Sequence, residues 1–144
     1  MSACVLDTDV VIAALDRRDT HHGKAAAAIK QMIAGEVDLH VSTINYAEAL
    51  VRPAENEETL KTAVDALSAL GVRPISPTPA IARDAARFRS LNISLADGFA
   101  LATARRHSAS VASFDRRVRR AMSKLNLKLP DALASESRGS DTTG

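Results

Sequence analysis

The segment VLDTDVVIAAL, residues 5–15, decides the fold of this chain. An apolar run that ends at Leu6 gives way to Asp7 and Asp9, and a second apolar run with helical character follows at once. A buried strand that leads directly into a helix is the unit from which parallel α/β sheets are built. In such sheets the functional crevice lies beyond the carboxyl ends of the strands, so Asp7 stands where catalytic charge gathers.

The same alternation continues along the chain. Strand-like apolar runs occupy residues 3–7, 37–42, 72–76, 108–113 and 126–129. Helical patterns occupy residues 10–15, 21–35, 44–52, 55–71, 77–91, 94–107 and 115–125. Strands separated by helices predict a parallel sheet covered on both faces. We therefore expect an α/β fold with three layers, α/β/α, and a sheet of five parallel strands.

The composition is that of one ordinary globular domain. The chain has 144 residues, of which 46% are hydrophobic and 25% charged, and this length is enough to bury one core. We place the domain at residues 1–130 and expect residues 131–144, which are small and polar, to form a disordered tail. No apolar run is long enough to cross a bilayer, and the amino terminus lacks the pattern of a signal peptide. We expect a cytoplasmic protein with no membrane contact.

Basic residues gather in one part of the chain, although the net charge is only +2. Between Arg105 and Lys128 there are eight basic residues and a single acidic one, Asp115. A phosphate backbone is one partner for such a segment, and a solvated helix face is the alternative. The candidates for holding a backbone are Arg105, Arg106, Arg116, Arg117, Arg119 and Arg120.

Asp97 is the strongest single candidate for a functional carboxylate. In SLADGFALATA, residues 94–104, it shares a helical face with Ala100, Leu101 and Ala104. Burial of an unpaired carboxylate is costly, so such a residue usually has a function. Ser94 stands three residues before Asp97, but the partner in a capping box is normally Glu or Gln. We expect Asp97 to point inward and not to serve as a cap.

The other carboxylates each have a structural alternative. Asp7 and Asp115 follow apolar runs, where an aspartate often caps the next helix. Glu48 lies in the middle of a helical segment at the border of an apolar stripe, where it would be a boundary residue with a solvated tip. Together, however, carboxylates that converge at strand ends repel one another and need a cation. Oxygen ligands without a Cys or His cluster favour Mg²⁺ or Mn²⁺ over zinc.

Four segments together resemble the PIN domain, the Mg²⁺-dependent ribonuclease fold to which VapC-type toxins belong. The segments are VLDTDVVIAAL (5–15), STINYAEAL (42–50), SLADGFALATA (94–104) and VASFDRRV (111–118). The resemblance covers about residues 3–129 and implies a five-stranded parallel sheet, frequent homodimers and an acidic pocket of Asp7, Glu48, Asp97 and Asp115. It also implies an RNA substrate and an antitoxin partner. Asp9 departs from the pattern, because Ser or Asn is common at that place.

The resemblance gives each site residue a role. Asp7, Asp97 and Asp115 are expected to bind Mg²⁺ or Mn²⁺ directly or through water, and Glu48 to hold a metal-bound water or a second ion. Ser113 is expected to support the pocket by a hydrogen bond. Asp9 is either a further ligand or a supporting charge. The reaction implied is hydrolysis of an RNA phosphodiester by a metal-activated water.

Two other readings compete. DTDVV, residues 7–11, also fits a haloacid-dehalogenase-like phosphatase in which Asp7 is the nucleophile and Asp9 the general acid. That mechanism requires a downstream lysine near the site, and Lys61 and Lys124 lie in amphipathic helical segments instead. The third possibility is a non-catalytic RNA-binding or interaction module. The presence of all four acidic residues argues against it.

Overall fold

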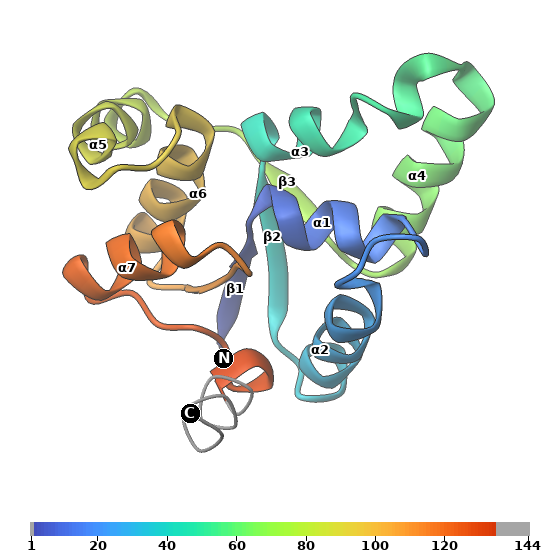
Figure 1. Ribbon diagram of the computed structural model, residues 1–144, viewed down its shortest axis with the longest axis horizontal. Helices are drawn as coiled ribbons and strands as arrows, with labels where there is room; N and C mark the ends of the chain where they lie inside the picture. Colours follow the sequence, from blue (N-terminus) through green and yellow to red (C-terminus); the bar gives the residue numbers. More distant parts are fainter. Residues whose placement is uncertain (1, 135–144) are drawn as a thin grey trace.

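The chain forms one parallel sheet with helices on both faces (Figure 1). The computed structural model describes residues 2–134. The strands are β1 (Ala3–Leu6), β2 (Asp38–Ser42), β3 (Arg73–Ile75) and β4 (Ser110–Ala112), in the order β3-β2-β1-β4. The helices are α1 (Thr8–Leu15), α2 (His22–Ala34), α3 (Thr43–Leu50), α4 (Glu57–Ala69), α5 (Pro79–Phe88), α6 (Leu95–Arg106) and α7 (Arg116–Lys124), with short 3₁₀ turns η1 (Pro53–Glu55) and η2 (Arg89–Leu91).

The expected three-layer architecture is confirmed. Helices α5, α6 and α7 cover one face of the sheet, and α1, α2 and α4 lie on the other (Figure 1). Successive residues of a strand point to opposite faces, and β1 shows this directly. Cys4 and Leu6 pack in the core beside α1 and α2, whereas Val5 packs in the core beside α5, α6 and α7.

The predicted fifth strand at residues 126–129 is wrong, because the described sheet has four strands. The segment lies beside β4 and makes one backbone hydrogen bond to it there, from Val111 N to Lys128 O at 2.9 Å. Asn126 has a left-handed backbone (φ 57°), and Leu127 N bonds back to Met122 O at the end of α7. These residues therefore close a helix and do not continue as a ladder.

The packed part of the chain continues beyond residue 130, where the sequence placed the boundary. Leu133 is 1% exposed and belongs to the core beside α1 and α2. Residues 135–144, most of the expected tail, lie outside the described residues. None of the helices in residues 2–134 has the length and apolar character needed to cross a membrane.

The order of the strands creates a switch point beside β1. The chain passes from β1 to β2 on one side, and β4 pairs with β1 on the other. Adjacent strands whose connections run to opposite sides leave a crevice at their carboxyl ends. Asp7 N donates to Ala112 O at 2.9 Å, so the residues that follow β1 and β4 start side by side.

Gly98 allows α6 to approach α5 closely. A Cβ atom at this position would lie 2.8 Å from the carbonyl oxygen of Ala85, a distance that real Cβ atoms essentially never show. Glycine is thus required by the contact of the two helices. Because Asp97 is the preceding residue, this contact also fixes where its carboxylate stands.

Candidate active site

Asp7 lies at the centre of the carboxyl edge. Its side chain is buried and accepts hydrogen bonds from Thr8 N at the start of α1 and from the Ser113 hydroxyl, each at 2.9 Å. Burial, followed by repulsion from Asp9 and Asp97, raises the pKa of Asp7 to about 8. The helix-capping alternative is therefore correct, but it does not account for a carboxylate that is so costly to ionise.

Ser113 links the segments that follow β1 and β4. Its hydroxyl donates to Asp7 Oδ2 and accepts from Asp115 N at 3.2 Å. Asp115 begins α7 by accepting from the backbone N–H groups of Arg117 and Val118, at 2.7 and 3.3 Å. Both bonds fall on Oδ1, so the other oxygen of Asp115 has no hydrogen bond among the described residues.

Asp9 ties the start of α1 to the loop after β4. Its Oδ2 accepts from Phe114 N at 2.9 Å, while its Oδ1 is buried without a partner among the described residues. Burial raises the pKa of Asp9, and repulsion from Asp115 and Asp97 acts in the same direction, against hydrogen bonds from Phe114 and Val10 that lower it. An orphaned buried oxygen in this position fits a cation or a water that the protein does not itself supply.

Asp97 reaches the same edge from the first turn of α6. Contrary to the sequence prediction, it does form a capping box: Ser94 Oγ accepts from Asp97 N at 3.0 Å, and Asp97 Oδ2 accepts from Ser94 N at 3.2 Å. The shorter Asp side chain reaches the cap as a Glu would. Its charge nevertheless acts on Asp7 and Asp9, raising the pKa of both, so it belongs to the cluster.

Glu48 joins the site through Thr8. The Thr8 hydroxyl donates to Glu48 Oε1 at 2.7 Å and accepts from Asn45 Nδ2 at 2.9 Å. Asn45 is fully buried and also donates to Ala96 O at 3.1 Å, so it connects α3 with the starts of α1 and α6. Glu48 itself is exposed. The sequence did not identify Thr8 or Asn45 as site residues. For Asn45 a signal was available, because it is a polar residue one turn before Glu48 and four residues before the apolar Ala49.

The arginines that the sequence offered for RNA binding fall into two groups, one near Asp115 and one away from it. Arg116 and Arg117 start α7 beside Asp115, and Arg117 lines a cleft of about 280 Å³ with Asp97 and Asp115. Arg119 Nε donates to Ser113 O at 2.8 Å and so supports the loop.

Three further arginines lie away from this cleft. Arg105 and Arg106 end α6, on the far side from Asp97. Arg106 pairs with Asp84 at 3.0 Å, and Arg105 lies 6.0 Å from the centroid of the Phe88 ring. Arg120 is exposed, with Nε 3.5 Å from Arg116 O. Arg89, which the sequence analysis did not single out, lines the cleft instead.

The carboxylates fit a divalent cation by chemistry and charge. In residues 2–134, no set of three or more His, Cys, Asp or Glu side chains is arranged tightly enough to hold an ion alone. Mg²⁺, however, usually keeps several waters and takes only one or two carboxylates directly. The raised pKa of Asp7 shows that its ionised form is costly without a counter-ion, and Asp9 Oδ1 is a buried oxygen with no hydrogen-bond partner among the described residues.

The sequence profile of the PIN domain matches residues 4–133. This chain belongs to the PIN-domain family. The match spans the strands, the helices and all four acidic segments described above. Comparison with curated proteins gave no match.

Solved structures share the fold of this PIN domain. VapC20 of Mycobacterium tuberculosis, described as a toxin that cleaves the sarcin-ricin loop, is 17% identical with a TM-score of 0.65 and covers 82% of this chain and 94% of its own. VapBC2 of Rickettsia felis, bound to promoter DNA, is 17% identical with a TM-score of 0.69, covering 89% and 97%. FitAcB of Neisseria gonorrhoeae is 23% identical with a TM-score of 0.61, covering 90% and 97%.

The phosphatase reading has no support in this PIN domain. Lys61 lies on the exposed surface of α4 and pairs with Asp65 at 2.7 Å. Lys124 is exposed at the carboxyl end of α7, whereas the acidic site lies at the amino end of that helix. Asp9 accepts a backbone hydrogen bond that holds a loop, which is a supporting contact.

Proposed function

We propose that this PIN domain is a Mg²⁺-dependent or Mn²⁺-dependent endoribonuclease, the toxin of a VapBC-type toxin-antitoxin system. The observation that carries the proposal is the meeting of Asp7, Asp97 and Asp115 at the ends of β1 and β4, where burial and like charge raise the pKa of Asp7 to about 8. The Asp7 carboxylate stays ionised at neutral pH only beside a cation. The PIN-domain family and the VapC fold are consistent with this chemistry.

The residues take the following parts in the proposed site. Asp7, Asp97 and Asp115 would hold the cation directly or through water, and Glu48, positioned by Thr8, would hold a bound water or a second ion. When bound, the cation would supply an activated water for hydrolysis of the phosphodiester and stabilise charge on the leaving oxygen. Ser113 orients Asp7. Asp9 supports the site from behind, because one of its oxygens holds the loop that carries Asp115.

The proposal includes partners. RNA is the substrate that fits a phosphodiesterase with arginines beside its acidic centre. VapBC2 of Rickettsia felis and a toxin-antitoxin complex of Klebsiella pneumoniae share the fold, and an antitoxin partner is proposed here by analogy with them. A homodimer and a cytoplasmic location stay predictions.

Cleavage of RNA by the purified protein tests the function. Ends should be mapped with and without Mg²⁺, for the wild type, for Asp97→Asn and for the control Asp65→Asn, an exposed carboxylate on α4. We expect cleavage only with the metal, loss of cleavage in Asp97→Asn and normal cleavage in Asp65→Asn. Full activity of Asp97→Asn would refute the proposed site, and RNA binding without cleavage in any divalent cation would favour a non-catalytic module.

A further inference from the structure

The cleft beside Asp97 and Asp115 contains two arginines that the acidic site does not use. We propose that Arg89 and Arg117 form a phosphate subsite, which holds a backbone phosphodiester of the substrate next to the one that is cut. The inference rests on the proposed function, for which it names a recognition element. The cleft has a volume of about 280 Å³, and its lining includes Arg89, Asn92, Ser94, Asp97, Asp115 and Arg117.

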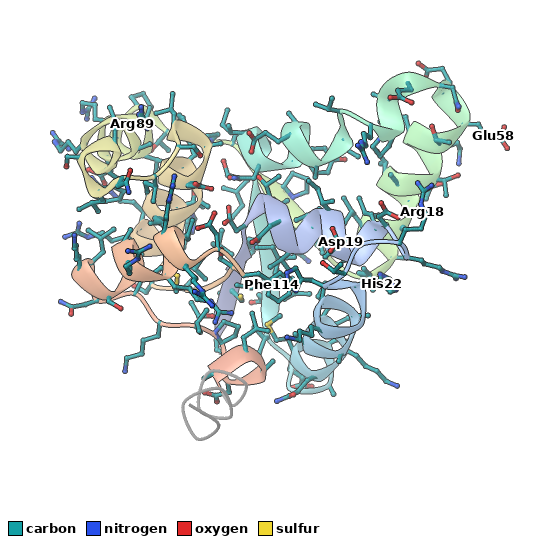
Figure 2. All side chains as sticks on the ribbon, viewed as in Figure 1. Arg18, Asp19, His22, Glu58, Arg89 and Phe114 are labelled. Carbon is teal, nitrogen blue, oxygen red and sulfur yellow. The ribbon has the colours of Figure 1, made fainter. Side chains whose placement is uncertain are left out.

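Arg89 is held in place by the chain around it. Its Nη1 donates to Ile93 O at 2.6 Å, across a turn in which Asn92 has a left-handed backbone with φ 62°. This bond fixes one nitrogen of the guanidinium and leaves the other donors for a ligand. Figure 2 shows Arg89 on the side of the sheet that carries α5, α6 and α7, the side from which Asp97 also comes.

Arg117 lines the cleft from a different element, α7. It lies in the first turn of α7, two residues after Asp115, and only its backbone N–H is bonded to that carboxylate. Among the described residues its guanidinium has no ion pair or hydrogen bond. Asp84, by contrast, is paired with both Arg87 and Arg106. If the cleft arginines served only to neutralise Asp97 and Asp115, ion pairs between them would be expected, and none is found in residues 2–134.

The chemistry of the cleft indicates what it binds. Two guanidinium groups offer planar, bidentate donors that match phosphate oxygens. A free anion would be repelled by the two carboxylates, unless they are neutralised by the cation of the proposed site. The volume is below the roughly 300–1,000 Å³ of pockets for drug-sized ligands, so we expect it to take one group of a larger molecule. A phosphodiester in a strand that continues into the metal site meets these conditions.

Binding measurements separate this subsite from general surface charge. A labelled single-stranded RNA is titrated in Ca²⁺ over a range of KCl concentrations with the wild type, Arg89→Ala, Arg117→Ala and Arg83→Ala. Arg83 is an exposed arginine on α5 outside the cleft and gives the charge-matched control. Each cleft variant should weaken binding about five- to tenfold and flatten the salt slope by about 0.7, while Arg83→Ala changes neither. Arg89→Lys should restore the slope but not the full affinity, because it lacks the guanidinium fork.

Turnover and competing ligands complete the test. Arg89→Ala should raise KM and leave kcat nearly unchanged, the pattern of a binding contact. DNA of the same sequence should lose affinity in parallel with RNA, because the subsite reads the backbone phosphate. Cleft variants that match Arg83→Ala in an active enzyme would overturn the subsite and leave the nuclease intact. Cleft variants that bind inorganic phosphate more weakly, but bind the strand as the wild type does, would also overturn it. The reverse result, in which the cleft variants bind the strand more weakly but the wild type cleaves nothing, would retain the subsite and refute the nuclease.

Discussion

Two clefts lined by described residues lie at opposite ends of the same sheet and differ in charge. The larger, about 400 Å³, lies at the amino end of β4, and the lining found in residues 2–134 holds Arg105 and Lys128 but no carboxylate. The smaller, about 280 Å³, lies at the carboxyl end and brings Asp97 and Asp115 together with two arginines. The acidic residues therefore gather according to the position of a cleft relative to the strand ends and not according to its volume.

Helix polarity explains why the two ends differ. At the carboxyl edge helices begin, so Asp7 and Asp115 lie at positive helix ends and accept their free N–H groups. At the other edge helices end, and Arg105 and Arg106 stand in the last turn of α6, where basic side chains are favoured. Helix polarity therefore explains why basic residues lie at that edge, and binding of nucleic acid is not needed to explain them.

The largest expected effect is a loss of RNA cleavage in the variant Asp7→Asn. Loss of a partner that only orients a metal ligand typically costs 10–100-fold, so loss of a ligand should cost about a hundredfold or more. Rate measurements on RNA at saturating Mg²⁺ check this. Lys128→Gln, which changes a charge in the larger cleft, is the control and should cleave normally. Equal losses in both variants would remove the distinction between the two ends of the sheet.

Asn45→Ala should give the next largest effect, also at the carboxyl edge. The change removes the donor to Thr8 and to Ala96 O, so the hydroxyl that holds Glu48 loses its orientation. We expect cleavage to fall about tenfold, the lower range for residues that orient a ligand. Unfolding in EDTA reports the structural cost, about 1–3 kcal/mol for broken buried hydrogen bonds.

Asn45→Thr separates the two effects, because it replaces the amide donor with a shorter hydroxyl donor. Partial recovery of Mn²⁺ affinity, measured by calorimetry, would support positioning of Glu48. A loss of stability with unchanged Mn²⁺ affinity and cleavage would make Asn45 a purely structural link between α3 and α6.

A third comparison concerns two helical glycines on opposite faces of the sheet, Gly98 in α6 and Gly23 in α2. Gly98→Ala should destabilise the protein by about 1–2 kcal/mol, since the strain of an atom 2.8 Å from Ala85 O exceeds the gain in helix propensity. Gly23→Ala on α2 meets nothing within 4 Å and should stabilise by up to about 1 kcal/mol. Denaturant unfolding of both variants measures the difference. Stabilisation by Gly98→Ala would show that α5 and α6 can separate without cost.

The locally encoded parts of the fold and site could be read from the sequence. Asp7 and Asp115 were placed correctly because a strand that runs into a helix is visible within about ten residues. The fifth strand was wrong because an apolar pattern does not reveal whether a segment pairs along its length. The Thr8 bonds to Glu48 and Asn45 join residues 40 and 37 positions apart, and no local pattern reports such contacts. Arg89 was missed for the same reason, since only the fold brings it to Asp97.

The metal-free protein should also show a pH dependence that originates at the carboxyl edge. The pKa of Asp7 is about 8 in the folded protein, against an ordinary value of 3.8 for an aspartate. Folded protein therefore holds a proton on Asp7 across this interval that unfolded protein has released, and stability falls as pH rises. This contribution is complete below pH 3.8 and is lost as pH rises through about 8. Denaturation in EDTA across this range should show the decline, and Asp7→Asn should flatten it; a decline that persists unchanged would assign it to other groups.

The smallest effect is expected at the far end of α6. Arg105 lies over the Phe88 ring and Arg106 pairs with Asp84, so both have partners within the fold. Replacing Arg105 with Ala should leave the affinity for RNA and its salt slope as they are, whereas Arg117→Ala should flatten that slope by about 0.7. Both changes remove one positive charge, so a general electrostatic attraction would affect them equally. Equal slopes for the two variants would show that RNA is held by net charge, and a difference confined to Arg117 would place the strand at the carboxyl edge.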